Sequence, residues 1–469
     1  MSTGFEEASR RVSTRHAESV RHFGILVALT VLALVILGYH PGLEDDAFYL
    51  AAIKQRLNPA LFPHDADFFR LQFQATLFDR LIAGSVRLTH IPLEWAALLW
   101  QFAAVLAILA ACWRIARQWA GVALVAALLS IPVAGTGISL VDQHLHPRAL
   151  ATAGVLWAVA MTLERRFVLA GLLLAGAASV HAIMASFGVS CCLFLALPRG
   201  VPGVALLLPL GWVFDPATEA WRRAAATRSF YFPLRWEWYE WVGVLAPVAL
   251  LWLFGRFGRR LAWFAIFQFV VAMAMMLPTG LERLRPLEPM RYLQLVYLLM
   301  FLLLGGLIGK SVWRWLVVFV PLCAVMTYAQ VRMYPASPHI ECPGKATENR
   351  WVKAFVWVRG NTPVDSYFAL DPEYMALPGE DFHGFRALAE RSALADNLKD
   401  PGMAARVPRL AGRWAAESDA QRGWRNFQAA DFERLKAEFG VDWVVVNRPS
   451  VSGLACSYRD GDLRVCRVE

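Results

Sequence analysis

The run Leu293-Gln-Leu-Val-Tyr-Leu-Leu-Met-Phe-Leu-Leu-Leu-Gly-Gly-Leu-Ile308 contains no charged side chain. A helix rises about 1.5 Å per residue, so this run and a few flanking residues cover the roughly 30 Å hydrocarbon core of a bilayer. Similar apolar blocks recur along the chain, at Phe23–Gly38, Leu99–Cys112, Trp241–Phe254 and Leu261–Leu277. Their number and length predict a polytopic α-helical membrane protein.

The overall composition agrees with this prediction. Of the 469 residues, 57% are hydrophobic and 18% are charged, and the mean hydropathy is +0.43. Soluble domains carry about 25% charged residues. Four Arg precede the first apolar run, as in a signal peptide, but Tyr39-His40-Pro41-Gly42 follows it in place of a small-residue cleavage site. We therefore expect the first run to be an uncleaved helix.

Residues 1–332 are expected to form a transmembrane domain of about eleven helices, with further helices in a first outer loop, residues 39–91. Residues 333–469 are expected to form a soluble periplasmic α/β domain. The predicted spans are 22–38, 92–113, 120–135, 149–163, 167–180, 182–198, 201–214, 241–256, 261–278, 290–309 and 313–331.

Short basic loops give these spans a direction. With the Arg-rich N-terminus in the cytoplasm, every short cytoplasmic turn carries Lys or Arg, as the positive-inside rule requires. These residues are Arg114, Arg117, Arg165, Arg166, Arg199, Arg256, Arg259, Arg260, Lys310 and Arg314. The membrane half has 28 basic and 18 acidic residues, whereas the chain from Pro335 has 18 and 19. This distribution indicates membrane topology and excludes nucleic-acid binding.

The tail shows alternating helix and strand signals. The predicted elements are a helix at Trp351–Val358, a strand at Asp365–Leu370, a helix at Phe432–Phe439 capped by Gly440, a strand at Val441–Val446 and a hairpin of Leu454–Tyr458 with Asp462–Val468. These follow from helical periodicity, β-branched runs and a glycine C-cap. The tail contains no phosphate loop or metal-ligand cluster, so we expect a packing or acceptor-binding domain.

Three of the seven cysteines lie in the tail. Cys456 and Cys466 flank the turn signal Asp460-Gly461, so a disulfide across this hairpin is plausible. Pairing of Cys342 with either remains an alternative, and one thiol would stay free. The other four, in apolar spans, are expected to be small hydrophobic residues.

The first outer loop opens with Glu44-Asp45-Asp46. Three adjacent carboxylates repel one another, and such a cluster suits a general base or a divalent-cation ligand. The alternative is a solvated helix N-terminus, where acidic residues are favourable. Helices predicted at Asp45–Arg56 and Ala66–Arg87 are amphipathic, and we expect them to lie in the membrane interface.

The second outer loop contains Asp142-Gln-His144-Leu-His146-Pro-Arg148. His and carboxylate side chains bind metals, and Arg binds phosphate in a bidentate manner. The alternative is a polar turn before Pro147 starts the next helix. A closed zinc site is not expected, because no further ligand pair has suitable spacing.

Two other outer positions carry polar residues. Arg291, at the mouth of the tenth span, is expected to meet a lipid phosphate or to extend to the headgroups. His181 between two spans is expected to be a hydrogen-bonded polar residue of the bundle. The Trp- and Arg-rich loop at 215–240 is typical of an interfacial aromatic belt, with sugar stacking as the alternative.

The layout resembles the GT-C superfamily of polytopic glycosyltransferases, which includes protein mannosyltransferases, aminoarabinose transferases and oligosaccharyltransferases. The resemblance lies in an acidic loop after the first span (Glu44–Tyr49), in Pro147-Arg148-Ala149-Leu150 and Pro289-Met290-Arg291-Tyr292 at helix starts, and in the α/β tail with Phe439–Val446. It covers the whole chain, but its motifs are short. The second loop has Asp142 and His144 where an Asp-x-Asp would stand, which leaves metal dependence open.

The resemblance implies a glycosyltransferase of the bacterial inner membrane. Its donor would be a polyprenyl-phosphate-linked sugar, and its acceptor a glycan, lipid or protein on the periplasmic side. Transfer would be inverting, with Asp46, or else Asp45, as the base. Arg148, Arg291, His144 and His146 would bind the substrate and its phosphate. A divalent cation, Mg²⁺ or Mn²⁺, would be held by Asp46, Asp142 and His144.

Two rival functions remain open. One is a transporter or flippase of a lipid-linked glycan, although the chain has no two-fold repeat and its acidic residues lie in a loop. The other is a non-catalytic protein of this layout that binds glycan or lipid.

Overall fold

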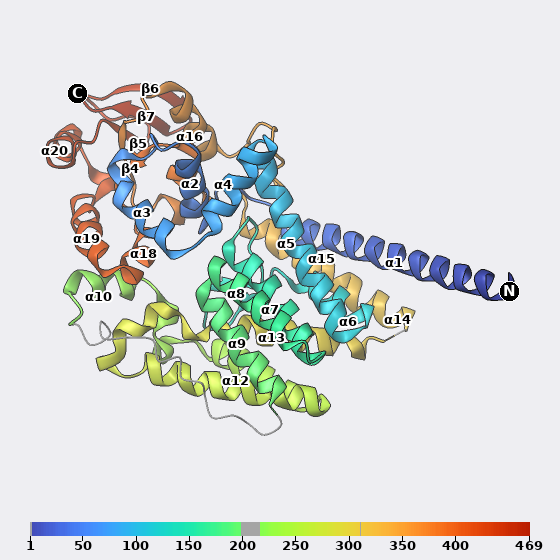
Figure 1. The fold of residues 1–469 in the computed structure, drawn as a ribbon. Coiled ribbons are helices and arrows are strands. Elements are labelled where there is room, and N and C mark those ends of the chain that lie inside the picture. The colour runs from blue at the N-terminus through green and yellow to red at the C-terminus, as the bar shows by residue number, and fades with distance from the viewer. Residues whose placement is uncertain (1, 198–215, 310) are drawn as a thin grey trace.

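The computed structural model describes residues 2–197, 216–309 and 311–469. A helical bundle is followed by a C-terminal α/β domain, and the N-terminal helix projects from the bundle (Figure 1). The bundle helices are α1 (Ser2–Leu37), α5 (Leu93–Ala116), α6 (Trp119–Leu128), α7 (Pro147–Leu163), α8 (Phe167–Val180), α9 (Ala182–Ala196), α11 (Trp238–Trp252), α12 (Gly255–Met276), α13 (Tyr292–Leu304), α14 (Val312–Arg314) and α15 (Val320–Met333).

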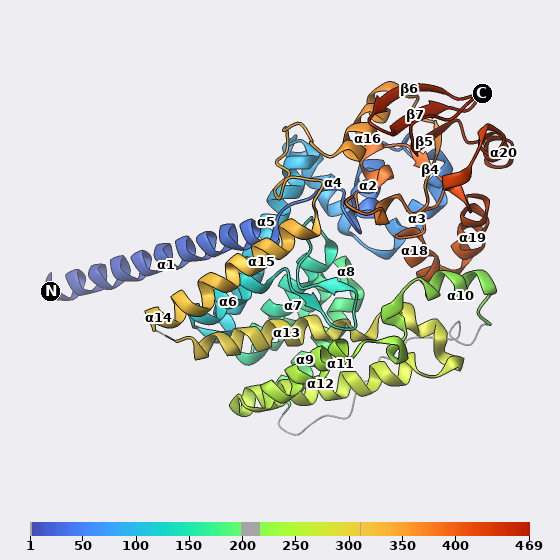
Figure 2. The same cartoon turned by 180° about the vertical axis from the view of Figure 1, so that it is seen from behind.

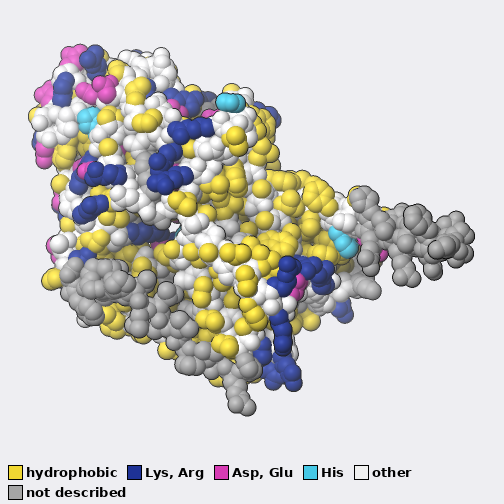
Figure 3. Space-filling model, viewed as in Figure 1, with side chains coloured by type: hydrophobic (Ala, Val, Ile, Leu, Met, Phe, Trp, Pro, Cys, Tyr) yellow, Lys and Arg dark blue, Asp and Glu magenta, His cyan; other side chains and the backbone are white. Residues whose placement is uncertain are grey.

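Five helical segments among the described residues are long and apolar enough to cross a membrane. They are Ala17–Leu37, Leu93–Ala116, Gly255–Met276, Pro289–Leu307 and Val312–Met333. Shorter apolar helices, α6, α7, α8, α9 and α11, pack among them. Hydrophobic side chains cover the bundle surface in Figure 3, whereas charged side chains gather over the C-terminal domain and at the opposite end of the bundle. The chain is a helical membrane protein.

Ten of the eleven predicted spans coincide with helices, and the predicted span at 201–214 lies outside the described residues. The prediction of a helix over 120–135 is wrong at its end, because α6 stops at Leu128. Pro132 disfavours helical geometry at the residue before it, and Gly135 and Gly137 adopt positive φ. A two-stranded hairpin of β1 (Pro132–Val133) and β2 (Ile138–Ser139) replaces the last predicted turns.

The short basic turns meet at one end of the bundle, which we name the basic end (residues 116–119, 164–166 and 253–260). Contacts between these turns and neighbouring helix ends are Arg114–Glu164 at 2.6 Å, Gln118 Nε2 to Leu302 O at 3.1 Å and Arg260 Nη1 to Leu195 O at 2.5 Å. The loops that carry the acidic motif (residues 44–46) and the histidine motif (residues 142–148) take no part in these contacts.

Those loops meet at the other end, which we name the polar end (residues 38–46, 131–147, 277–291 and 333–341). Contacts between its segments are His40 N to Gln143 O at 2.8 Å and Glu341 N to Tyr39 O at 2.8 Å, and Gln143 Nε2 also donates to Gln330 Oε1 of α15 at 2.7 Å. Segments far apart in sequence are thus joined around one surface of the bundle.

The first outer loop folds into α2 (Asp46–Leu57), α3 (Ala66–Ala75) and α4 (Phe78–Thr89). The single helix predicted over Ala66–Arg87 is interrupted at Thr76, whose hydroxyl donates to Val180 O at 2.6 Å. The helix predicted at Asp45–Arg56 is present and is covered by protein, and its place in the membrane interface stays a prediction. Residues 46–54 of α2 are buried, and α2 packs against α17 (Phe385–Ala389) of the C-terminal domain.

The C-terminal domain is built on a five-stranded sheet in the order β4-β3-β5-β7-β6. The strands are β3 (Tyr367–Leu370), β4 (Ser392–Ala393), β5 (Trp443–Asn447), β6 (Ala455–Asp460) and β7 (Leu463–Arg467). Strand β3 pairs in parallel with β4 and β5, and the β6–β7 hairpin is antiparallel. The helices are α16 (Arg350–Asn361), α17, α18 (Asp400–Arg406), α19 (Ala411–Ala420) and α20 (Ala429–Phe439).

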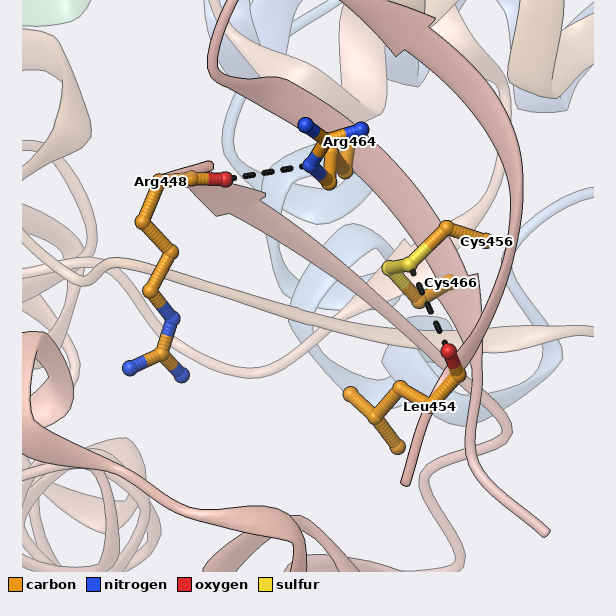
Figure 4. The surroundings of a disulfide bond; sticks show 5 residues. All are labelled: Arg448, Leu454, Cys456, Arg464 and Cys466. Carbon is orange, nitrogen blue, oxygen red and sulfur yellow. Dashed lines mark hydrogen bonds between the residues drawn. A yellow bond between two sulfur atoms is a disulfide. The ribbon is translucent and has the colours of Figure 1, made fainter. Parts of the chain in front are cut away.

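Each helix and strand predicted for this domain coincides with an element of the structure. Gly440 ends α20 with φ of +81°, the left-handed conformation that favours glycine at a C-cap. Cys456 and Cys466 form a disulfide between paired positions of β6 and β7 (Figure 4), and Cys342 is free. The fold is therefore mixed α/β, with its parallel strands on one side of the sheet.

The C-terminal domain docks onto the polar end through two surfaces. One is α2, and the other is α10 (Glu219–Ala226), which packs on α18 and α19. Trp221 of α10 is buried there and donates from Nε1 to Ala405 O at 2.8 Å (Figure 2 shows α10 below α18 and α19). The loop predicted as an aromatic belt is thus divided, because Trp238 remains 74% exposed while Trp221 belongs to the domain contact.

Candidate functional site

A cavity of about 630 Å³ opens at the polar end, between the bundle and the C-terminal domain. Its size lies within the range of about 300–1,000 Å³ for small-molecule sites. Its polar and aromatic walls come from six regions of the chain: Glu44, Asp45, Asp142, Gln143, Arg148, Tyr239, Glu240, Tyr297, Tyr334 and Lys399. The β1–β2 hairpin supplies most of the remaining wall.

In the first loop, the carboxylate of Asp45 lies among several charged side chains. Lys399 Nζ lies 3.2 Å from Asp45 Oδ1 and also forms an ion pair with Glu44. Burial alone would raise the pKa of Asp45, but Lys399, His146 and Arg148 together hold that pKa well below its usual value. Asp45 is therefore ionised at neutral pH and accepts hydrogen bonds only.

The second loop supplies a buried row formed by Asp142, His146 and Arg148. Arg148 Nη2 donates to Asp142 Oδ1 at 2.5 Å, while Arg148 Nε and Nη1 are buried without a hydrogen-bond partner. Burial, with Arg148 nearby, lowers the pKa of His146 to about 4, so this imidazole is neutral at pH 7. The row places an incompletely paired guanidinium in the cavity wall.

The tautomer of His146 follows from its contacts. Its Nδ1 accepts from Arg148 N at 2.9 Å, so the ring proton resides on Nε2, which lies 3.6 Å from Asp45 Oδ2. The two oxygens of Asp45 thus face different groups, Lys399 and the His146 N–H. Lys399 and His146 therefore fix the orientation of the Asp45 carboxylate, which keeps its negative charge.

Asp46 and His144 are both buried and lie outside the residues that form the cavity wall. Asp46 Oδ2 accepts from Gly42 N at 2.7 Å, which stabilises the turn before α2. Burial raises the pKa of Asp46, against the opposing effect of His144. Both ring nitrogens of His144 lack hydrogen-bond partners.

Arg291 does not line the cavity and belongs to an ionic cluster with Glu288 and Arg406. Its Nη1 contacts Glu288 Oε2 at 2.7 Å, and Arg406 from α18 donates to both oxygens of the same carboxylate at 2.9 Å. Arg291 Nε is buried without a hydrogen-bond partner. His181, the other isolated polar residue, accepts at Nδ1 from Met184 N at 3.3 Å and caps α9.

The predicted cation ligands do not form a set. Within residues 2–197, 216–309 and 311–469, no group of three or more His, Cys, Asp or Glu side chains is arranged to hold a metal ion. Asp46 is engaged by the backbone of Gly42, and Asp142 by Arg148. The residues present therefore do not fit the divalent-cation site expected from Asp46, Asp142 and His144.

Lys399 is the principal site residue that the sequence did not single out. It follows β4, where Asp396 Oδ1 accepts backbone N–H groups of the turn and Arg228 Nη2 donates to Lys399 O at 3.0 Å. Pro401 at the start of the next helix marks this turn in the sequence, but no local signal connects it to Asp45. Only the docking of the C-terminal domain brings them together.

No protein-family model matches this chain, and no curated protein matches it significantly. Its function must therefore be inferred from the residues of the site.

Proposed function

We propose that the protein is a membrane glycosyltransferase of the GT-C type that acts at the polar end of the bundle. The observation that carries this proposal is one cavity that holds both an ionised carboxylate, Asp45, and an incompletely paired guanidinium, Arg148. A base for an acceptor hydroxyl and a cation for a leaving phosphate are the two groups that such a transfer requires.

In the proposed reaction, an acceptor oxygen attacks C1 of the donor sugar while Asp45 accepts the hydroxyl proton. The bond between C1 and the phosphate oxygen breaks, and its electron pair leaves with the polyprenyl phosphate. The free N–H groups of Arg148 stabilise the charge that develops on that phosphate. Attack opposite to the leaving group inverts the configuration at C1.

Asp45 takes the role of base in preference to Asp46. Asp45 lines the cavity, whereas Asp46 is buried and accepts the N–H of Gly42. In this proposal Asp46 supports the loop, and Lys399 with His146 orients the reacting carboxylate. Arg291 does not line the cavity and is paired with Glu288.

The proposal includes a place in the cell. The N-terminus and the basic end face the cytoplasm, and the cavity and C-terminal domain face the periplasm of a bacterial inner membrane, with about eleven spans in total. The charge of the turns supports this orientation. The donor lipid then approaches through the apolar surface of the bundle.

The test uses the full chain in lipid vesicles with a panel of polyprenyl-phosphate monosaccharides and measures release of free polyprenyl phosphate. Asp45→Asn is expected to lower turnover by about 10²–10⁴-fold, because it removes the base. Asp67→Asn is the matched control, since Asp67 is an exposed acid of the same loop that pairs with Arg70 at 2.7 Å.

Full activity of the Asp45→Asn variant would show that the base is assigned wrongly. If the wild type moves the intact donor between leaflets and releases no polyprenyl phosphate, the protein is a flippase. If it binds donor and does neither, it is a binding protein.

A further inference from the structure

A second cavity, of about 300 Å³, lies within the C-terminal domain and takes no part in the proposed transfer. Its walls are formed by Asp371, Leu377, Trp424, Arg425, Asn447 and Arg448. None of these residues belongs to the cavity at the polar end. The two sites can therefore be perturbed separately.

The position of this cavity follows from the topology of the sheet. The chain leaves β3 toward β4 on one side and later returns to form β5 on the other side of β3. Asp371 directly follows β3, and Asn447 and Arg448 stand at the end of β5. This is a topological switch point at the carboxyl ends of parallel strands, where open α/β sheets bind ligands.

The loops that leave these strands complete the site. Leu377 belongs to the connection after β3, and Trp424 and Arg425 to the connection that leads into β5. Trp424 is held by Phe427 and Phe432, with ring centroids 5.3 Å away in both cases. A rigid aromatic ring and an aliphatic side chain thus form the apolar part of the wall.

The charged groups indicate the chemistry of the ligand. Two arginines, Arg425 and Arg448, line the same cavity as one carboxylate, Asp371, whose Oδ1 already accepts from Glu373 N at 3.0 Å. Arg448 Nη2 is buried without a hydrogen-bond partner. Figure 4 shows the Arg448 side chain extending away from the β6–β7 disulfide, while its carbonyl oxygen accepts from Arg464 Nε at 3.2 Å.

We propose that this switch-point cavity binds a sugar-sized molecule that carries a phosphate or carboxylate group. Arg448, with Arg425, binds the oxyanion through its planar N–H groups. Asn447 and Asp371 supply hydrogen bonds for hydroxyl groups, and Trp424 supplies the apolar contact. The volume, at the lower end for small-molecule sites, suits one sugar ring. Binding at this cavity does not depend on the proposed transferase activity.

The test measures binding by calorimetry and by the shift of the unfolding temperature, with the full chain in detergent. The probes are glucose 1-phosphate, glucuronate, neutral glucose and inorganic phosphate. At least one of the two anionic sugars is expected to bind and to raise the unfolding temperature. Which of the two binds identifies the oxyanion as phosphate or carboxylate.

Arg448→Met is expected to weaken that binding at least tenfold. Arg425→Gln serves as a second variant whose exposed side chain can be changed without loss of the fold. Arg459→Gln, an exposed Arg of β6 outside the cavity, is expected to bind as the wild type does. Equal binding of neutral glucose, equal or tighter binding of inorganic phosphate, or unchanged binding by both cavity variants would overturn the proposal.

Discussion

Lys399 contacts two of the three acidic side chains that open the first outer loop, Glu44 and Asp45, although it belongs to the C-terminal domain. Removing its charge in Lys399→Met is expected to raise the pKa of Asp45, because Lys399 is a major cause of its depression. We expect turnover to fall about 10- to 100-fold through loss of orientation. We also expect the acidic limb of the pH–rate profile to move to higher pH.

Lys399→Arg is the matched control, because it keeps the positive charge. It is expected to keep the acidic limb in place. An unchanged pH profile in Lys399→Met would show that Lys399 supports only the domain contact. The profile separates the two roles, since a purely structural defect lowers the amount of active protein without moving the pH dependence.

Glu341 joins two segments of the polar end to the C-terminal domain through one carboxylate oxygen. His40 Nδ1 lies 2.8 Å and His383 Nε2 3.1 Å from its Oε1. Burial raises the pKa of Glu341, but hydrogen bonds from the two histidines outweigh burial and lower that pKa to about 2. Since the folded pKa lies below the unfolded value near 4.5, the ionised carboxylate stabilises the folded state above pH 4.5.

Glu341→Gln is therefore expected to lower the free energy of unfolding at pH 7 by about 3 kcal/mol. The difference from the wild type should shrink as the pH falls from about 4.5 to about 2, where the wild-type carboxyl is protonated as well. Thermal unfolding across this pH range measures it. Glu348→Gln, at an exposed position nearby, should unfold as the wild type does. A difference between Glu341→Gln and the wild type that stays constant with pH would show that the Glu341 carboxylate does not titrate as proposed.

At the scale of single residues, the sequence indicates only one of the two partners in each of these contacts. Asp45, His146 and Arg148 are recognisable because polar clusters are rare in so apolar a chain. Lys399 and Glu341 are not, because their partners are 354 and 301 residues away and neither lies in an unusual local pattern. The family resemblance favours Asp46 over Asp45 as the base, but only the tertiary fold decides which of two adjacent carboxylates turns inward to a backbone N–H.

Helix α6 crosses the C-terminal end of α13 at two glycines, Gly121 in α6 and Gly305 directly after α13. A Cβ on Gly305 would lie 2.7 Å from both Ala120 O and Gly121 N, and one on Gly121 would lie 3.0 Å from Leu302 Cδ1. Close backbone approach through small residues is typical of membrane helix pairs. Gly121→Ala is expected to separate the helices and to cost about 1–3 kcal/mol.

Thermal unfolding in detergent measures this cost, with Gly171→Ala as the control. Gly171 lies on α8, and a Cβ added there would meet no atom within 4 Å. Alanine at this position should therefore be neutral or stabilising by up to about 1 kcal/mol. Equal unfolding temperatures for the two variants would mean that the α6–α13 crossing tolerates a methyl group.

The β6–β7 hairpin carries the disulfide of the chain, between Cys456 and Cys466. Denatured protein alkylated without reduction is expected to take up five labels, and seven after reduction, because the other five cysteines are free. Mass spectrometry counts the labels. Seven labels before reduction, in protein quenched directly in cells, would place this hairpin in a reducing compartment.

At the scale of elements, the sequence predicts most helices and strands because their signals are local. Apolar length defines the spans, β-branched runs define β5, and Gly440 defines the end of α20. The failures are positions decided by tertiary contacts. Helix α6 stops early where the β1–β2 hairpin lines the cavity, and the helix predicted over 66–87 is interrupted at Thr76, which bonds to the backbone of Val180 more than 100 residues later.

At the scale of the whole molecule, the bundle separates two kinds of loop. The basic turns meet at one end, and the cavity and the C-terminal domain lie at the other. The carboxyl edge of the parallel strands faces the bundle, because Lys399 follows β4 and Asp65 of the first loop accepts from Ala393 N at 3.2 Å. The domain therefore forms part of the site as well as covering it.

This arrangement predicts the topology that reporter fusions will find. Alkaline phosphatase fused after Glu469 should be active and green fluorescent protein at the same position dark, since the former folds only outside the cytoplasm and the latter only inside. Fusions after Arg166, in the turn between α7 and α8, should give the opposite pair of results. The physical reason is the excess of Arg in the short turns of the basic end.

The two fusion sites test the two ends of the bundle separately. If both report the cytoplasm, the C-terminal domain lies on the same side as the basic turns, and the contacts of Lys399 with Glu44 and Asp45 would require the first loop to lie there too. If both results are reversed, the cavity faces the cytoplasm, where a free thiol pair at Cys456 and Cys466 is expected. The cysteine count and the fusions must therefore agree, and disagreement between them would refute the orientation on which the proposed periplasmic transfer depends.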